Sequence, residues 1–522
     1  MVRTLRKLAL AALTGACLGG LLWTWLAPPW VEPPGEPLGP WGPELDLRAS
    51  FESLPRVRGR APRLQLLDEN QDAWVARWRL LASARHRIDM ASFIVRRDEY
   101  GLAFLGHLLA RARDGVRVRV LVDAQGTHMA RSFLDEDYLD ELVAAGVEAR
   151  VYRPLPERFL QALIELDPAS AVASEHDKLL LVDGRWGLIG GRNVAKEYFA
   201  DPASHPQAFL DADLLVEGPA AVRALTQAFE VEWTSPSTEP IAREKLDLVP
   251  SEAELLEAYR AMDAWLRGED PGQGEVARAL RERHPGLQGA LQAPPPPRAR
   301  GEVRVLDSSA RRLRMDDPVT EGLRRLLVAA ERRVLIVSPY LVLTPEAIEE
   351  LSRAAGRGVE ITVLTNSPTS SDNALSQAYF AEQWPTLLAR VPGLRLFVRG
   401  DDHNLHAKTA TFDGQVAVVA TYNLDPLSMA INGEIAVVAW SPELAASIER
   451  SAGAMLQAGP PTVYEYRILR DEEGEPVLDE EGQPQVLFGP QDHTDRSRWS
   501  GMDAWWSAIR AARQLGLDPV AH

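Results

Sequence analysis

Two stretches of the chain carry a histidine, a lysine and an aspartate at the same spacing. They are His176, Lys178 and Asp183 in the first copy and His406, Lys408 and Asp413 in the second. An imidazole can attack a phosphorus atom, and an ammonium group beside it can neutralise the phosphate oxygens. The apolar run 179–182 indicates a strand, which we expect to begin at His176 and to place His176 and Lys178 on one face. Each stretch therefore predicts a site for chemistry on a phosphodiester.

An asparagine follows each stretch at a matching offset. The segments that end in it are Gly190, Gly191, Arg192 and Asn193 in the first copy and Ala420, Thr421, Tyr422 and Asn423 in the second. The strands expected over 186–190 and 415–419 would run back antiparallel and bring both asparagines beside the histidines. Because an amide can donate hydrogen bonds to phosphate oxygens, Asn193 and Asn423 are predicted site residues.

The aspartates of the two stretches need a different explanation. Seven residues of strand at ~3.3 Å each would place Asp183 roughly 23 Å from His176, too far to orient that imidazole. Each aspartate is followed by a glycine and stands between two apolar runs, which is typical of a tight hairpin turn. We therefore expect Asp183 and Asp413, together with Gly190 and Gly191, to have structural roles.

A reactive histidine needs a carboxylate at its other ring nitrogen, because that contact fixes the tautomer and raises the basicity. Each half offers one on a later strand: Asp211 in the first half and Glu434 in the second. Asp213 lies on the same face as Asp211 and is the alternative to it. Glu175, directly before His176, is expected to face solvent.

The motifs lie in two regions that repeat the pattern strand, helix, strand. These elements are expected over 87–93, 102–113 and 115–123 in the first region and over 333–339, 345–355 and 358–366 in the second. This spacing predicts a βαβ unit in each region. The predicted fold class is α/β, duplicated, with two similar halves that each contain a mainly parallel sheet and flanking helices.

The bulk composition narrows the function. With 57 basic and 74 acidic residues among 522, the formal net charge is -17, which disfavours binding to nucleic acid by phosphate neutralisation. Cys17 is the only cysteine, so neither an intramolecular disulfide nor a cysteine-based zinc site can form. The predicted segments are 1–27 (membrane anchor or signal segment), 28–55 (Pro-rich spacer), 56–240 (first half), 241–300 (helical insert and Pro-rich linker), 301–460 (second half) and 461–522 (C-terminal strands and amphipathic helix).

The N-terminus predicts a membrane anchor. Basic residues are followed by Leu8 to Ala27, 20 residues without a charge, which is longer than the apolar region of most cleaved signal peptides. The preceding positive charges would keep the N-terminus in the cytoplasm and place the catalytic part on the periplasmic side of a bacterial-type inner membrane. Lipoprotein processing at Cys17 is the alternative.

Two amphipathic helices are predicted outside the repeated regions. The first, between Ser251 and Ala293, is expected to cover one domain. The second repeats Met502, Trp505, Trp506 and Ile509 at steps of three and four residues after short strands at 464–469 and 485–488. It could dock on the second half, or its tryptophans could lie at a lipid interface.

At these motifs the chain resembles the phospholipase D superfamily, over roughly Leu64 to Ala454. Residues 423–434 look closest to bacterial cardiolipin synthases. The resemblance implies that both motifs converge on one shared active site and that one histidine forms a covalent phosphohistidine while the other protonates the leaving alcohol. By analogy with bacterial relatives, His176 is the expected nucleophile. The resemblance also implies that no metal or other cofactor is needed.

The chain departs from that family in two places. Ala420-Thr421 stands where glycine-serine is usual, and Leu427 stands where cardiolipin synthases commonly carry arginine. Loss of that arginine removes a contact to an anionic head group, which puts the acceptor in question more than the chemistry.

The leading hypothesis is a phosphatidyltransferase of cardiolipin-synthase type. Its partners would be a phospholipid substrate, an alcohol or water acceptor and the membrane, and a monomer would suffice because both motifs lie in one chain. A hydrolytic phospholipase D is the alternative. A nuclease of the same superfamily and an inactive binding protein are less favoured.

Overall fold

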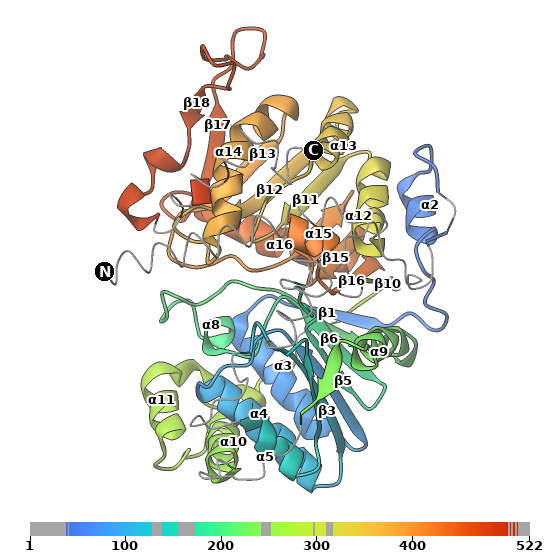
Figure 1. Ribbon diagram of the computed structural model, residues 1–522, viewed down its shortest axis with the longest axis vertical. Coiled ribbons are helices and arrows are strands. Elements are labelled where there is room, and N and C mark those ends of the chain that lie inside the picture. The colour runs from blue at the N-terminus through green and yellow to red at the C-terminus, as the bar shows by residue number, and fades with distance from the viewer. Residues whose placement is uncertain are drawn as a thin grey trace.

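The computed structural model shows two halves, each a sheet with helices packed against it (Figure 1). Each sheet has nine strands. The structure describes residues 38–39, 41–127, 138–154, 173–241, 252–295, 298–308 and 317–499, with residues 502, 505, 506 and 509. The predicted α/β class and the duplication are confirmed.

The first sheet has the strand order β8-β4-β3-β2-β5-β6-β7-β1-β9. Its strands are β1 Arg63–Leu67, β2 Arg87–Ser92, β3 Arg117–Asp123, β4 Glu148–Tyr152, β5 Leu179–Val182, β6 Trp186–Gly190, β7 Asp213–Glu217, β8 Thr238–Pro240 and β9 Ala299–Arg300.

The second sheet has the order β10-β16-β15-β14-β11-β12-β13-β17-β18. Its strands are β10 Glu302–Ser308, β11 Arg333–Val337, β12 Glu360–Asn366, β13 Arg395–Arg399, β14 Thr409–Phe412, β15 Val416–Ala420, β16 Glu434–Trp440, β17 Val463–Ile468 and β18 Val486–Phe488. When the first order is reversed, β1, β7, β6, β5, β2, β3 and β4 correspond to β10, β16, β15, β14, β11, β12 and β13, so the two halves share one topology.

The prediction of mainly parallel sheets is wrong. Only β2, β3 and β4 in the first sheet and β11, β12 and β13 in the second pair in parallel, and the other pairings are antiparallel. The βαβ units supply those parallel strands. The hairpin that carries each histidine motif, β5–β6 or β14–β15, extends the sheet in antiparallel fashion.

Helices cover both sheets. In the first half they are α3 Asn70–Ser83, α4 Glu99–Arg113, α5 Tyr138–Ala144, α8 Lys196–Phe199, α9 Pro219–Trp233, α10 Glu252–Arg267 and α11 Glu275–Arg283. Those against the second half are α2 Leu47–Glu52, α12 Pro318–Ala329, α13 Pro345–Gly356, α14 Ala374–Arg390, α15 Pro426–Ala430 and α16 Pro442–Ala458. Single 3-10 turns are η1 Pro285–Leu287, η2 Ala290–Gln292, η3 Pro490–Asp492 and η4 Arg496–Arg498.

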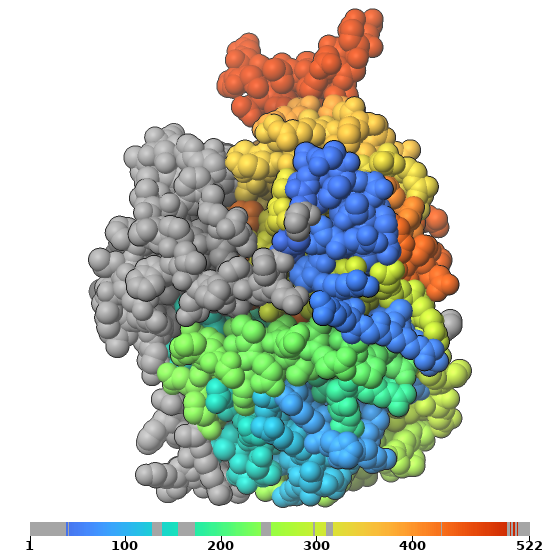
Figure 2. Space-filling view, turned by 90° about the vertical axis from the view of Figure 1, so that its right-hand side faces the viewer, coloured from blue at the N-terminus to red at the C-terminus, as the bar shows by residue number. Residues whose placement is uncertain are grey.

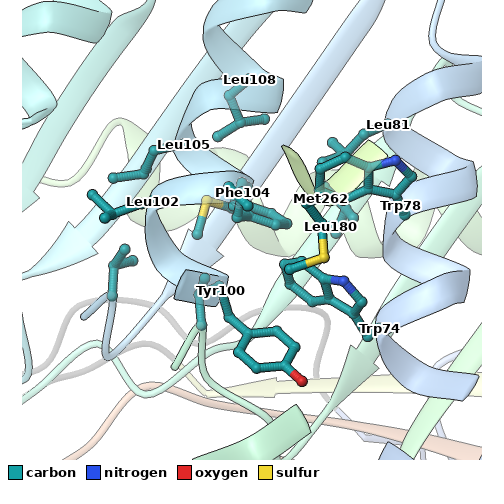
Figure 3. Close-up of a cluster of buried hydrophobic side chains, with 14 of the residues drawn as sticks. Trp74, Trp78, Leu81, Tyr100, Leu102, Phe104, Leu105, Leu108, Leu180 and Met262 are labelled. Atoms are coloured by element: carbon teal, nitrogen blue, oxygen red, sulfur yellow. The ribbon is translucent and has the colours of Figure 1, made fainter. Parts of the chain in front are cut away.

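The helical insert belongs to the core of the first half, as predicted. Figure 3 shows Met262 of α10 beside Trp74, Trp78 and Phe104, and all four side chains are buried. The ring centroids of Trp74 and Tyr100 are 4.8 Å apart in an edge-to-face arrangement, which favours tight aromatic packing. The insert therefore covers one face of the domain.

An apolar layer joins the two halves. Leu181, Ile189 and Val216 from the first sheet belong to the same buried cluster as Val419 and Val437 from the second. Because burial of such side chains stabilises by about 25 cal/mol per Å² of apolar surface, this layer favours one fixed arrangement of the halves. The loops that carry the two motifs meet at this junction.

The end of the predicted spacer packs against the second half. Leu47, Phe51 and Leu54, in and beside α2, enter the core of the second half, and Arg325 donates to the Gly39 carbonyl over 2.8 Å. Figure 2 shows this N-terminal segment lying against the second half. The predicted anchor, residues 1–27, lies outside the described residues, and among those described no helix is long and apolar enough to span a membrane.

The C-terminal segment docks on the second half, as one of its two predicted roles requires. The predicted short strands are β17 and β18. Trp506 Nε1 donates to the Ala378 carbonyl of α14 over 3.0 Å, and Ile509 packs in one cluster with Val342 and Tyr379.

We expect deletion of residues 499–522 to lower thermal stability, because it removes the buried Met502 and Ile509 side chains. Their burial contributes about 3–6 kcal/mol in all. The measurement is the melting temperature, together with activity on vesicles and on a short-chain soluble substrate. Equal loss on both substrates supports docking alone. A deletion variant that keeps its melting temperature and fails only on vesicles would favour the lipid-interface role instead.

Candidate active site

Each motif histidine is bound by a carboxylate of the opposite half. His176 Nδ1 lies 3.0 Å and 3.1 Å from the two carboxylate oxygens of Glu434, and His406 Nδ1 lies 2.7 Å from Asp211 Oδ2. The two predicted carboxylates are thus the ones that contact the histidines. Each carboxylate contacts the histidine of the other half, whereas the sequence analysis assigned each carboxylate to the histidine of its own half. Neither half contains a complete histidine–carboxylate pair.

Backbone hydrogen bonds hold this crossed arrangement in place. The His176 amide donates to the carbonyl of Gly433, which precedes Glu434, over 3.1 Å. The His406 amide donates to the carbonyl of Leu210, which precedes Asp211, over 2.7 Å. The same relation occurs twice, so each histidine is fixed through its main chain and its ring by one loop of the other half.

The alternative carboxylate, Asp213, has another role. Its side chain is completely buried and forms ion pairs with Arg77 at 2.8 Å and Arg192 at 3.1 Å. Arg192 also donates to the main-chain carbonyls of Leu67 and Asp211. Asp213 therefore neutralises two buried guanidinium groups that support the Asp211 loop.

Both lysines lie in the site beside the histidines. Lys178 Nζ donates to the His176 carbonyl over 2.6 Å, and Lys408 Nζ lies 2.9 Å from His406 Nδ1. The strand, however, begins at Leu179 instead of His176, because the His176 amide bonds to Gly433 of the other half and not to a neighbouring strand of its own sheet. The ring of Phe93 lies against both His176 and Lys178.

Burial controls the protonation of the site. It lowers the pKa of Lys178 to about 7 and that of Lys408 to about 8, although nearby carboxylates act in the opposite direction. Burial also lowers the pKa of His176 and of His406. Burial raises the pKa of Glu434, but His176 and Lys178 outweigh it and bring that pKa to about 2. In the free site the imidazoles are therefore favoured in their neutral form, and a bound phosphate would favour the charged form of the lysines and of one imidazole.

The two asparagines differ in their contacts. Asn193 Nδ2 donates to the Tyr198 hydroxyl over 2.8 Å, and its Oδ1 accepts from the Ile94 amide. The ring of Tyr198 in turn lies edge-on to His406, with centroids 5.3 Å apart. Asn423 is also buried, and its backbone amide donates to Ser428. Asn193 thus contacts the second histidine through Tyr198, and donation by either asparagine to a phosphate stays a prediction.

The residues that precede each asparagine lie close to the carboxylates. A Cβ at Gly191 would lie 2.1 Å from Asp211 Oδ1, and one at Gly190 would lie 2.3 Å from Asp213 Oδ1, so glycine is required at both positions. In the second half Thr421 replaces that glycine, and its hydroxyl donates to Glu434 Oε2 over 2.6 Å. The second half therefore gives its orienting carboxylate a hydrogen bond that Gly191 cannot give Asp211.

Three supporting residues escaped sequence reasoning. Ser428 donates to Glu434 Oε1 over 2.6 Å, while Thr421 and Tyr198 make the contacts described above. Ser428 follows Asp425, whose carboxylate caps α15 through the Ser428 amide. The sequence signal for Ser428 was Asp425, a residue type that often caps a helix and that lies two residues after Asn423.

The predicted structural role of the motif aspartates agrees with their contacts. The Asp183 carboxylate accepts hydrogen bonds of 2.8 Å from the amides of Arg85, His86 and Arg87, and Asp413 accepts from residues 331–333 in the same way. Both aspartates have positive φ, 52° and 53°, as a tight hairpin turn requires.

We expect Asp183→Asn to lower the free energy of unfolding by roughly 1–2 kcal/mol, because the amide keeps only one acceptor oxygen. Burial raises the Asp183 pKa, but the three backbone donors outweigh it and depress that pKa. The carboxylate therefore stabilises above its unfolded pKa of about 4, and this stability is lost as the pH falls below that value. Chemical unfolding at pH 7 and pH 3 should show a smaller pH dependence in the variant. A folded but inactive variant would contradict the structural role.

The expectation for Glu175 is wrong. Its side chain is 1% exposed, not solvated, and burial together with Glu232 and Asp177 raises its pKa far above the ordinary range. The cause is the backbone of its neighbours: Ser174 and His176 bond to Gly433 of the other half, which draws Glu175 into the junction. Glu175 is therefore favoured as a neutral acid.

Comparison with known proteins agrees with this geometry. The family model described as cardiolipin synthase, PLD-like domain, matches residues 78–233 and 323–456. Cardiolipin synthase C of Escherichia coli is 30% identical over 416 residues, which cover 74% of this chain and 82% of that protein. An uncharacterised protein of Helicobacter pylori is 25% identical over 86% of this chain and 89% of its own length.

One solved structure shares the fold over nearly the whole length. Phosphatidylserine synthase of Haemophilus influenzae superposes with a TM-score of 0.58 at 14% identity, covering 90% of this chain and 98% of that one. Both histidine motifs fall within the matched family regions. The chain therefore belongs to the phospholipase D superfamily, in the cardiolipin synthase, PLD-like domain family.

Proposed function

We propose that this protein is a phosphatidyltransferase that moves a phosphatidyl group from a phospholipid to an alcohol through a phosphohistidine. The observation that carries the proposal is the pair of histidines, each with its Nδ1 bound to a buried carboxylate of the opposite half. Nδ1–H donation to the carboxylate leaves Nε2 of each ring as the nitrogen that can react, and Lys408 Nζ lies 3.1 Å from Nε2 of His406. The similarity to cardiolipin synthases supports a phospholipid substrate.

In the first step, Nε2 of one histidine, which we assign to His176, attacks the phosphorus. The bond between phosphorus and the leaving alcohol oxygen breaks, and His406 in its protonated form donates a proton to that oxygen. In the second step, neutral His406 takes the proton of the incoming hydroxyl, whose oxygen displaces His176 from phosphorus. Lys178 and Lys408 balance the negative charge on the phosphoryl oxygens in both steps.

We also propose that residues 1–27 anchor the protein in a bacterial-type inner membrane with the catalytic part on the periplasmic side. The 20 uncharged residues after the basic N-terminus support this placement. An anchored enzyme would meet both phospholipids in one bilayer.

The direct test is the lipid composition of cells that express the protein, compared with cells that express His176→Ala. Accumulation of a transfer product such as cardiolipin only with the active protein supports a transferase. Accumulation of phosphatidic acid alone would assign a hydrolase, with water as the acceptor. Unchanged lipids, despite equal protein levels, would contradict the proposed function.

A further inference from the structure

A third carboxylate, Asp372, lies at the edge of the active site. Asp211 and Glu434 are 3% and 0% exposed and each binds a histidine, whereas Asp372 is exposed to solvent. The Tyr340 hydroxyl donates to Asp372 Oδ1 over 2.8 Å. Within the described part of the chain, Oδ2 of Asp372 takes part in no hydrogen bond. That oxygen is open to a ligand.

The loop that carries Asp372 begins beside His406. Asn366, the last residue of β12, donates through Nδ2 to the Leu405 carbonyl over 2.8 Å and accepts from the Leu405 amide over 2.9 Å. Ser370 Oγ donates to the same Asn366 side chain. Loop 367–373 is therefore attached to the residue directly before His406.

The residue that holds Asp372 is attached to the other end of the second motif. Leu341, next to Tyr340, forms a parallel bridge with Leu424, which directly follows Asn423. Tyr340 itself is 8% exposed, so its hydroxyl has a defined position. These two attachments join the Asp372 loop to the segment before His406, and its partner Tyr340 to the segment after Asn423.

The electrostatics agree with that placement. Burial lowers the pKa of His406 and of Lys408, and Asp372 is one of the charges that act in the opposite direction on both groups. A carboxylate whose charge acts on both of these groups also repels the phosphate of a substrate. It cannot serve phosphate binding, so its partner is a different part of the substrate. The leaving or incoming alcohol carries no negative charge near its reacting oxygen. We therefore take the alcohol as the partner of Asp372.

We propose that Asp372 accepts a hydrogen bond from a second hydroxyl on the alcohol, and so selects glycerol-type head groups over alcohols with a single hydroxyl. This inference rests on the proposed function. The leaving and the incoming alcohol exchange protons with the same histidine, so both occupy this place in turn. Asp372 is a specificity-determining residue in this account.

The test compares two alcohols of equal carbon number with full-length protein in detergent. In one arm, transfer to glycerol is compared with transfer to 1-propanol. In the other, hydrolysis of phosphatidylglycerol is compared with hydrolysis of phosphatidylpropanol. The preference is the ratio of the rate with the glycerol compound to the rate with the propanol compound. We expect this ratio to fall at least about tenfold in Asp372→Ala, because the variant loses one hydrogen bond to a charged group. A fall in one arm alone assigns the contact to the incoming or to the leaving alcohol.

Further variants separate this contact from a general disturbance. Asp372→Asn keeps the shape without the charge and should fall between the wild type and Asp372→Ala. Tyr340→Phe, which frees the carboxylate, should lower the preference by a smaller factor. Glu472→Ala removes an exposed carboxylate from a distant turn and should leave the preference unchanged.

Two outcomes contradict the inference in distinguishable ways. If wild type and Asp372→Ala both turn over substrate with the same preference, Asp372 does not bind the alcohol, while the proposed function stands. If the wild type neither transfers nor hydrolyses any of these substrates, the proposed function fails and the inference fails with it.

Discussion

Substitution of either histidine should abolish turnover: we expect His176→Ala and His406→Ala each to lower kcat by about 10⁴-fold or more. In the proposed mechanism one imidazole is bonded to phosphorus while the other moves the proton, so neither can replace its partner. The measurement is single-turnover and steady-state release of head group, with circular dichroism as the check on folding. Near wild-type activity in either variant would contradict the two-histidine mechanism.

The matched controls are histidines outside the site. His205 is partly exposed and bonds to Ser204, so His205→Ala should leave kcat within about twofold of wild type. A comparable loss in this control would indicate that the assay reports folding rather than chemistry.

The crossed carboxylates should have the second-largest effect. We expect Asp211→Asn and Glu434→Gln each to lower kcat by about 10²–10⁴-fold while the protein stays folded, because the amide can hold the imidazole in the wrong tautomer. His406 depends on Asp211 and His176 on Glu434, so both steps of the reaction are affected. The measurement is kcat beside the melting temperature. Retained activity in both variants would show that the carboxylates only fill space.

Asp213→Asn is the control that separates orientation of a histidine from structural support of the Asp211 loop. Asp213 lies two residues after Asp211 but pairs with Arg77 and Arg192, and it does not contact a histidine. Removal of its charge leaves two buried guanidinium groups undercompensated, so the melting temperature should fall. Folded Asp213→Asn protein should keep more activity than Asp211→Asn, and the reverse order would contradict the assignment.

The residues of the site could be predicted from sequence because each type has a distinct chemical use. His176 and Lys178 recur with the same spacing as His406 and Lys408. The aspartate–glycine pair between two apolar runs predicts a hairpin turn without any information from distant residues. Asp211 and Glu434 could be chosen because a reactive imidazole requires a carboxylate. All of these signals are local in the chain.

What could not be predicted depends on contacts between distant segments. Asp211 and His406 are 195 residues apart in the chain. No periodic pattern in the sequence indicates which half supplies the carboxylate for a given histidine. The burial of Glu175 follows from the same junction. The share of parallel pairing was overestimated because the aspartate–glycine turns indicate only the two hairpins. The antiparallel pairing of β1 with β7 and of β10 with β16 joins distant segments and has no local signal.

The account's central claim is a covalent phosphohistidine in a site shared by both halves. The most direct measurement is to mix enzyme with a phosphatidyl substrate, stop the reaction within one turnover, and map the adduct by mass spectrometry. We predict a phosphatidyl adduct on His176 that is absent in His176→Ala and that decays when an alcohol acceptor is added. An adduct on His406 would exchange the two roles within the same mechanism. Rapid turnover with no adduct on either histidine, or with an adduct on another residue, would contradict the claim.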